Sequence, residues 1–233
     1  MSKIDHIVIL TGAGISAESG IETFRDAGGL WEGHAVDQVA TPEGFAADPV
    51  LVHRFYNLRR AALSTVRPNA AHIALGRLQS EFAGHVTLVT QNVDDLHERG
   101  GSLDVIHMHG ELLSAFCSAC DHRWRQADDL SVETPCPACQ TVGGPRPDIV
   151  WFGEMPYQMN RIETALQSCD LFVSIGTSGA VYPAAGFVQL AHAYGARTLE
   201  LNLEPSQGSA FFTQTQYGPA TRLVPDWVSS ILS

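Results

Sequence analysis

Two pairs of cysteines constrain the fold of this chain more than any other feature. Cys117 and Cys120 form one C-x2-C pair, Cys136 and Cys139 form the other, and fifteen residues separate the pairs. This spacing is typical of a zinc ribbon, in which four thiolates bind one Zn²⁺ tetrahedrally. Four protein ligands leave no position for water, so we expect a structural metal. Two disulfides are the alternative, but they require an oxidising compartment.

Composition and charge limit the classes of partner. The chain has 233 residues, a hydrophobic fraction of 45% and a formal net charge of −11 at pH 7. Contacts with nucleic acid need a positive surface, which such an acidic chain does not favour. No apolar stretch approaches the roughly 20 residues of a membrane-spanning helix, and the first apolar run, at Ile7, begins too early for a signal peptide. We expect a cytoplasmic monomer that binds neither nucleic acid nor membranes.

Short apolar runs alternate with helix-like segments along most of the chain. Four of these runs are continuously apolar and predict strands of a parallel sheet covered on both faces: 7–10, 86–90, 171–175 and 198–201. Between them, segments such as 70–82 and 161–168 have helical character. This alternation predicts an α/β fold with a doubly wound, Rossmann-like sheet.

Two segments interrupt this alternation. Residues 28–75 contain no good strand and are predicted to be a helical insertion, and residues 114–145 hold the cysteine ribbon. The rest, 1–27, 76–113 and 146–233, is assigned to the Rossmann-like part of a single catalytic domain, 1–233. We expect the two insertions to lie near each other, and a ligand to bind between them and the sheet.

A glycine turn follows the first predicted strand. In Gly12-Ala13-Gly14, backbone N–H groups and a helix N-terminus can approach a pyrophosphate, although turn geometry alone explains such glycines equally well. The acidic residue that a redox dinucleotide fold places about twenty positions later is missing. Polar groups stand instead at two later strand ends, in the segments 176–178 and 202–204. A nucleotide fits this pattern better than ordinary hydride transfer does.

Two further polar clusters follow predicted strands. Gln91-Asn92-Val93-Asp94 comes after the run 86–90, and His107-Met108-His109-Gly110 comes after the run 103–106. Polar side chains and a histidine at one sheet edge can orient a sugar and remove a hydroxyl proton. Alternatively, Asn92 and Asp94 cap a helix and the histidines pack in the interior.

Together these motifs resemble those of the sirtuin family. The run from Thr11 to Ile21, TGAGISAESGI, followed by Thr23-Phe24-Arg25, is similar to the sirtuin signature. Glu22 stands where the family usually has proline or a small residue. The remaining motifs follow in sirtuin order, so that the resemblance extends from Ile7 to about Pro225: the segments 91–94, 109–110, 150–154 and 176–178 and the four cysteines.

The resemblance implies an NAD-consuming protein-lysine deacylase with NAD as co-substrate and one structural Zn²⁺. By similarity, His109 is the general base that deprotonates a ribose hydroxyl, and the products are free lysine, nicotinamide and 2′-O-acyl-ADP-ribose. The resemblance implies these NAD-binding residues: Gly12, Ala13, Gly14, Ile15, Ser16, Glu18, Phe24, Arg25, Trp31, Gln91, Asn92, Asp94, Gly176, Thr177, Ser178, Asn202, Leu203, Glu204 and Ala220. It implies that the acyl-lysine substrate is held by Val150, Trp151, Phe152, Gly153 and Glu154.

A tyrosine and an arginine bear on the choice of acyl group. Tyr56 and Arg59 are three positions apart, hence on one face of a predicted helix. A phenol and a guanidinium can grip a carboxylate, although from the residues alone a packed tyrosine beside a solvent-facing arginine is the simpler interpretation. With the small Ala40, the pair is similar to the sirtuin subgroup that removes succinyl, malonyl and glutaryl groups. Bacterial members of that subgroup also deacetylate, so we expect both activities.

Three other functions remain open from the sequence. The same nicotinamide chemistry serves NAD-dependent ADP-ribosylation of protein, and a plain deacetylase would lack the preference for acidic acyl groups. A non-enzymatic zinc-ribbon module that contacts nucleic acid is the third. Residues 114–145 contain two arginines against four acidic residues, so no basic face supports that module. The deacylase remains the expected function.

Overall fold

Six parallel strands form the main sheet, in the order β11-β10-β9-β1-β4-β5. The computed structural model describes residues 3–21, 30–31 and 33–233, with the backbone alone for Leu30 and Trp31. The four strands predicted from apolar runs are confirmed to within a residue at each end. The strands of this sheet are β1 (His6–Thr11), β4 (His85–Thr90), β5 (Ile106–His107), β9 (Leu171–Ile175), β10 (Arg197–Asn202) and β11 (Gln214–Tyr217).

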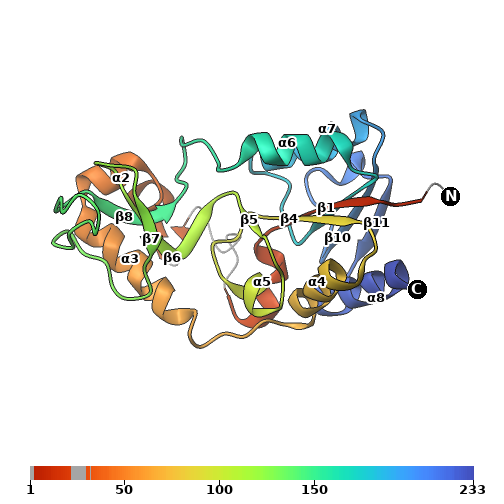
Figure 1. Cartoon of the computed structure of the whole chain (residues 1–233), viewed down its shortest axis with the longest axis horizontal. Coiled ribbons are helices and arrows are strands. Elements are labelled where there is room, and N and C mark those ends of the chain that lie inside the picture. Colours follow the sequence, from red (N-terminus) through yellow and green to blue (C-terminus); the bar gives the residue numbers. More distant parts are fainter. Residues whose placement is uncertain (1–2, 22–29, 32) are drawn as a thin grey trace.

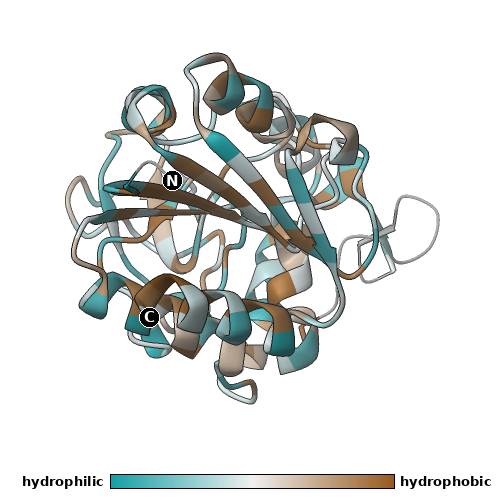
Figure 2. Cartoon of the chain, turned by 90° about the vertical axis from the view of Figure 1, so that its right-hand side faces the viewer, coloured by the Kyte–Doolittle hydropathy of each residue, from teal (hydrophilic) through white to brown (hydrophobic). Residues whose placement is uncertain are grey.

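Helices cover both faces of this sheet, as a doubly wound fold requires (Figure 1). α4 (Ala70–Glu81) and α8 (Ala220–Leu232) lie on one face, and α6 (Met159–Ser168) and α7 (Phe187–Ala193) lie on the other. Successive strand residues point to opposite faces, so Ile7 and Ile9 enter one core cluster while Val8 and Leu10 enter the other. Figure 2 shows these apolar strands between two layers of helix. Burial on both faces is the reason that the strand sequences are mostly apolar.

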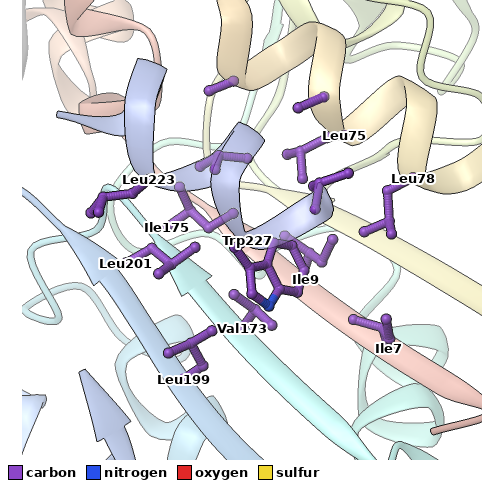
Figure 3. Close-up of a cluster of buried hydrophobic side chains, with 14 of the residues drawn as sticks. Ile7, Ile9, Leu75, Leu78, Val173, Ile175, Leu199, Leu201, Leu223 and Trp227 are labelled. Atoms are coloured by element: carbon purple, nitrogen blue, oxygen red, sulfur yellow. The ribbon is translucent and has the colours of Figure 1, made fainter. Parts of the chain in front are cut away.

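One of the two clusters joins α4 and α8 to the sheet. Figure 3 shows Trp227 of α8 lying against Ile9 and Val173, with Leu75 and Leu78 of α4 on the same side. Leu75 and Leu78 are fully buried. Truncating either side chain to alanine removes about 2–5 kcal/mol of stability, because the cavity left behind closes only partly.

A smaller part lies at the other end of the molecule (Figure 1). Its antiparallel sheet has the order β7-β6-β8. α3 packs on this sheet, because Phe55 and Tyr56 share a core cluster with Leu112 and Ile149. Asn57 of α3 also exchanges two hydrogen bonds with the Leu130 backbone, so the segments 28–75 and 114–145 lie side by side. The elements of this part are β2 (Leu30–Trp31), β3 (His34–Ala35), α1 (Val36–Val39), α2 (Pro42–Ala47), α3 (Pro49–Ala62), β6 (Gly110–Cys117), β7 (Arg123–Arg125) and β8 (Pro145–Ile149).

The observed elements differ from the predicted ones at several places. The pair β2–β3 is antiparallel, within a segment in which no strand was predicted. The boundary drawn after residue 75 falls inside α4, whose Ala71, Ala74 and Leu75 pack in the main core as one helical face. β6 and β8 also extend beyond the assigned ribbon limits, 114–145, at both ends. Strand pairing continues past the metal-binding loops, and cysteine spacing cannot show where it stops.

Local sequence signals set the start of α3, the helix that carries Tyr56 and Arg59. The carboxylate of Asp48 accepts a hydrogen bond from the Leu51 N–H over 2.9 Å, and Pro49 occupies the first helical position. None of the described helices is both long and apolar enough to cross a membrane. The remaining short helices are η1 (Ala13–Ile15), η2 (Ala17–Ser19), α5 (Leu96–Arg99), η3 (Ala184–Gly186) and η4 (Ser209–Phe211).

Candidate active site and metal centre

The strand order reverses between β1 and β9. From β1 the chain continues outward to β4 and β5, whereas β9, β10 and β11 extend in the other direction. Ligands of open α/β sheets bind at such a switch point, beyond the carboxyl ends of the strands. The turn after β1 contains Gly12 and Gly14, and the turn after β9 begins with Gly176. Both predicted glycine turns therefore lie at the switch point.

The two turns touch through their backbones. The Gly12 N–H donates to Ile175 O over 3.0 Å, and the Gly14 N–H donates to Gly176 O over 2.9 Å. A Cβ atom on Gly14 would lie 2.8 Å from the Gly176 Cα, so only glycine permits this approach. These two N–H groups are thus engaged within the protein. The glycines bring the two turns together, which the sequence did not reveal.

Polar contacts fix the neighbouring strand ends in the same way. The Asn202 side-chain amide donates to Thr177 O over 2.8 Å, and both residues are buried. Ser178 O accepts from the Gln207 N–H over 3.0 Å. Leu203 and Glu204 are exposed immediately after β10. The predicted residues 176–178 and 202–204 thus line adjacent ends of β9 and β10.

Glu18 links the glycine turn to α8. Its carboxylate accepts from the Thr221 N–H over 3.0 Å and from the Thr221 hydroxyl over 2.8 Å. This contact places Ala220, the first residue of α8, close to the turn. Ile15, also predicted to bind the cofactor, is fully buried in the main core, where its side chain packs. The side chains of Glu18 and Ile15 are therefore both engaged in contacts within the protein.

Ser16, Asn92 and Asp94 form a buried polar cluster. The Asn92 side-chain amide donates to Ser16 Oγ over 3.1 Å, and Ser16 Oγ donates to Asp94 Oδ2 over 3.0 Å. Burial raises the pKa of the Asp94 carboxyl, although its hydrogen bonds act in the opposite direction. Asp94 Oδ1 also accepts from the Leu96 N–H over 3.0 Å at the start of α5. Asp94 can therefore stabilise the start of α5 and still belong to a polar ligand pocket.

Two nearby histidines have pKa values shifted in opposite directions. His109 Nδ1 lies 3.1 Å from Gln91 O, and burial lowers the pKa of the half-buried imidazole below 6.5. A carbonyl only accepts, so Nδ1 carries the proton and Nε2 is the basic nitrogen. His107 Nε2 lies 2.8 Å from Glu98 Oε1. Burial acts to lower the pKa of His107, but Glu98 outweighs it and the pKa is raised.

A cluster of aromatic side chains surrounds Ala40 in the smaller part. Ala40 and Tyr56 share a buried cluster with Trp151, and the Trp151 indole N–H donates to Tyr56 Oη over 3.0 Å. Burial raises the pKa of the Tyr56 phenol, so it stays protonated. The Phe152 N–H donates to Ala40 O over 2.9 Å. Ala40 and Tyr56, two of the three predicted acyl-group residues, are therefore in direct contact with the predicted substrate segment 150–154.

Arg59 is buried rather than solvent-facing, with 7% of its surface exposed. Its Nη1 donates to Phe55 O over 3.0 Å, and its guanidinium carbon lies 3.3 Å from the centroid of the Phe55 ring. An arginine held in this way keeps its charge inside the protein. The simpler interpretation of the sequence, a surface arginine beside a packed tyrosine, is wrong for Arg59.

The four cysteine sulfurs converge in the ribbon. They lie within 4.8 Å of one another, with 3.8 Å between Cys117 and Cys139 and 3.7 Å between Cys120 and Cys136. Tetrahedral zinc with bonds of about 2.3 Å requires sulfur–sulfur separations of about 3.8 Å. A disulfide would require about 2.05 Å, and all four cysteines are free. The cluster fits one Zn²⁺ with a complete protein shell.

Some residues of interest were missed or cannot be placed. Phe24 and Arg25 lie outside the described residues, and the side chain of Trp31 is likewise not described. Sequence reasoning missed Phe45, whose ring centroid lies 5.3 Å from that of Trp151, and Arg146, which pairs with Glu154. In the sequence, the ion pair is indicated only by the presence of an arginine eight residues before a glutamate.

Comparisons with known proteins identify the family of this chain. The Sir2 family profile matches residues 12–183. An NAD-dependent protein deacylase of Vibrio parahaemolyticus is 57% identical over 230 residues, covering 98% of this chain and 95% of that protein. A crystal structure of a Sir2 homologue in complex with NAD is 34% identical, with a TM-score of 0.90, and covers 99% of this chain and 92% of that one. A Sir2 protein bound to an acetylated peptide is 26% identical, with a TM-score of 0.84, over 99% of this chain and 95% of that one. The chain belongs to the Sir2 family.

Proposed function

We propose that this protein is an NAD-dependent protein-lysine deacylase that removes succinyl, malonyl and glutaryl groups as well as acetyl groups. Membership of the Sir2 family and 57% identity to a protein deacylase support the general reaction. The preference for acidic acyl groups rests on one observation: a buried Arg59 on the same helix as a buried Tyr56, in a cluster with Ala40. The products are free lysine, nicotinamide and 2′-O-acyl-ADP-ribose.

NAD would bind at the switch point of the main sheet. Its adenosine half would lie along Gly176, Ser178 and Asn202, at the ends of β9 and β10, and its nicotinamide would enter the cluster of Ser16, Asn92 and Asp94. When bound, NAD supplies the ribose carbon that accepts the acyl oxygen as nicotinamide leaves. Open α/β sheets hold nucleotides at such a switch point.

His109 would act as the general base. Its Nδ1 proton is held by Gln91 O, so Nε2 can accept the proton of the ribose hydroxyl that takes over the acyl group. Burial keeps the imidazole neutral. The Val150 N–H donates to His109 O over 2.9 Å, and this bond ties the base to the segment proposed to bind the substrate backbone.

The acyl group would extend toward α3. A succinyl carboxylate can form charge-assisted hydrogen bonds with the Arg59 guanidinium and accept one from the Tyr56 hydroxyl. The small side chain of Ala40 leaves room for the longer chain. An acetyl group ends before these residues, so water must occupy the remaining space, and acetyl-lysine should be turned over less well.

Paired peptides that differ only in the acyl group test this function. We expect NAD-dependent turnover of succinyl-lysine to exceed that of acetyl-lysine. In Arg59→Met, kcat/KM for the succinyl peptide should fall roughly ten- to a hundredfold, the loss expected for hydrogen bonds to a charged group. Deacetylation should survive. Arg54→Met is the matched control, because Arg54 lies on the same helix but is exposed.

Two outcomes would contradict the proposal. If the acetyl peptide is preferred and Arg59→Met changes neither activity, the protein is a plain deacetylase. If mass spectrometry finds an ADP-ribosylated peptide in place of acyl-ADP-ribose, the reaction is ADP-ribosyl transfer.

We also propose a cytoplasmic monomer that binds no nucleic acid. Free thiols in a zinc-type cluster suit a reducing compartment, and the net charge of −11 disfavours contact with phosphates. Light scattering of the purified protein tests the monomer.

A further inference from the structure

Trp151 is held in place by two charged residues, Arg146 and Glu154, of which Arg146 has no role in the proposed reaction. The Arg146 guanidinium carbon lies 3.7 Å from the centroid of the Trp151 ring, a cation–π contact. Arg146 Nη1 and Nη2 donate to the two carboxylate oxygens of Glu154, each over 2.8 Å. Glu154 Oε2 accepts in turn from the Trp151 backbone N–H over 2.9 Å. We call Arg146 and Glu154 together the tryptophan clamp.

The tryptophan clamp is ionised and rigid. Arg146 is buried, with 8% of its surface exposed, and a two-point contact with a carboxylate fixes the plane of its guanidinium. Burial acts to raise the pKa of Glu154, but hydrogen bonds from Arg146 and from the Trp151 N–H outweigh it and the pKa is lowered. The two charges cancel locally. The clamp therefore orients the indole without adding net charge beside the acyl group.

The position of Arg146 itself is set by the antiparallel sheet. Arg146 lies in β8 opposite Phe116 of β6, and the next pair in register is Pro145 with Cys117. A second hydrogen bond from Nη2 reaches Ile149 O over 3.0 Å. Strand pairing and the bond to Ile149 O fix the guanidinium to the antiparallel sheet. Glu154 fixes it to the substrate segment.

The orientation of the indole decides the role of the Tyr56 hydroxyl. An indole N–H only donates, so Tyr56 Oη must be the acceptor in its 3.0 Å bond to Trp151 Nε1. The phenol hydrogen is therefore directed away from the indole nitrogen and can be donated only to another acceptor. A carboxylate on the acyl group is such an acceptor, whereas the methyl of an acetyl group is not.

We propose that Arg146 is a positioning residue for acyl-group selection, acting through Trp151 on the hydrogen of Tyr56. This inference rests on the proposed preference for acidic acyl groups and adds a determinant outside α3. Without the clamp the indole can rotate away from Tyr56, and the phenol hydrogen is no longer fixed in one direction. Recognition of the carboxylate then weakens, while the chemistry at His109 is unchanged.

A double-mutant cycle tests this coupling. Arg146→Met removes the clamp, and Trp151→Phe removes the indole N–H but keeps a packed ring. For each single variant we expect the ratio of kcat/KM for succinyl over acetyl peptide to fall about three- to tenfold, the value of one hydrogen bond, mainly through KM. In the double variant this ratio should fall no further than in the more affected single variant, because both substitutions disrupt the same set of contacts.

Arg123→Met is the control for the loss of a stacked arginine. Arg123 lies over the Phe116 ring at 4.5 Å and pairs with Asp148 instead of Glu154. It should leave the succinyl-to-acetyl ratio unchanged. If Arg146→Met fails to fold by circular dichroism, Glu154→Gln opens the clamp from its other side and replaces it in the cycle.

The outcomes separate this inference from the proposed function. If unmodified protein prefers succinyl-lysine and depends on Arg59, but the clamp variants leave the ratio unchanged or add to Trp151→Phe, the inference is overturned and the proposed function stands. If unmodified protein does not turn over succinyl-lysine, the proposed function fails. In that case a crystal structure of Arg146→Met tests the positioning role of Arg146. An intact Trp151–Tyr56 hydrogen bond overturns that role, and a broken one supports it.

Discussion

The imidazole of His109 donates its Nδ1–H to the backbone carbonyl oxygen of Gln91 over 3.1 Å. This bond selects one tautomer and leaves Nε2 with the lone pair that a general base needs. Burial lowers the pKa of the same ring below 6.5. The bond and the burial together keep His109 neutral and correctly oriented at physiological pH.

The first prediction concerns the acid limb of the pH–rate profile. A lowered pKa means that His109 stays neutral to lower pH than a free histidine, so kcat/KM should remain flat at pH 7 and fall only below pH 6.5. His109→Ala should reduce turnover by about 10²–10⁴. His122→Ala, at an exposed position in the ribbon, is the control. A limb centred above pH 6.5 would show that His109 is not the base.

The second prediction concerns the metal. Four free sulfurs within 4.8 Å of one another should bind one Zn²⁺ per chain, measured by elemental analysis. Folding and metal binding are coupled in such sites. A strong chelator should therefore lower the melting temperature, and re-added zinc should restore it. Cys117→Ala should be zinc-free and misfolded, whereas Cys169→Ala should keep its zinc. A folded, active Cys117→Ala protein without zinc would refute the structural role.

The third prediction concerns Gly110, the first residue of β6, which directly follows His109. It has φ +84°, and an added Cβ would lie 2.0 Å from Asp148 O. Gly101 has a similar φ of +97° but open space around it. Gly101→Ala should therefore lose about 1–2 kcal/mol of unfolding free energy from the backbone conformation alone. Gly110→Ala should lose about 1–3 kcal/mol more from the collision. Urea unfolding of both variants measures the difference, and equal losses would exclude the collision.

The fourth prediction concerns the buried His53. It is 3% exposed, its ring packs edge-on against Phe45 at 5.4 Å, and neither ring nitrogen has a hydrogen-bond partner within the part of the chain that the structure describes. Burial and the nearby Arg60 lower its pKa from 6.5 to about 4. The unfolded chain therefore binds a proton at higher pH than the folded protein does, and stability falls as pH drops from 6.5 toward 4.

His53→Gln should remove this pH dependence. Its unfolding free energy should decrease less than that of the unmodified protein between pH 6.5 and pH 4, in urea titrations at several pH values. The difference between pH values is the measurement, since the buried amide can itself change stability at pH 7. His85→Gln, at an exposed position, should behave like the unmodified protein. Parallel pH curves for His53→Gln and unmodified protein would contradict the assignment.

The main sheet was predictable because its strands are buried on both faces. Such strands appear in the sequence as short continuous apolar runs, and these runs predicted β1, β4, β9 and β10 to within a residue at each end. β11 was not predictable in this way. All four of its residues, Gln214–Tyr217, are exposed, and it is held by backbone pairing to β10. Pairing through the backbone leaves no trace in side-chain hydrophobicity.

The candidate site also has a part that could be predicted from the sequence and a part that could not. The cysteine cluster and the common helical face of Tyr56 and Arg59 are matters of short-range spacing, which helix geometry and turn lengths fix locally. The spacing did not show whether that helical face points inward. Burial of Arg59 depends on what packs over α3, and that includes Trp151, 95 residues from Tyr56 along the chain.

The sequence by itself determined the type of fold, the metal ligands and the order of the motifs, because each depends on neighbouring residues. Only the tertiary structure decided which polar groups already have partners. The Glu18 carboxylate is engaged by Thr221, 203 residues away, and the glycine N–H groups by the turn after β9. It also decided that Arg146 holds Trp151 in place. Contacts between distant segments depend on the packing of the whole chain, and local spacing carries no record of them.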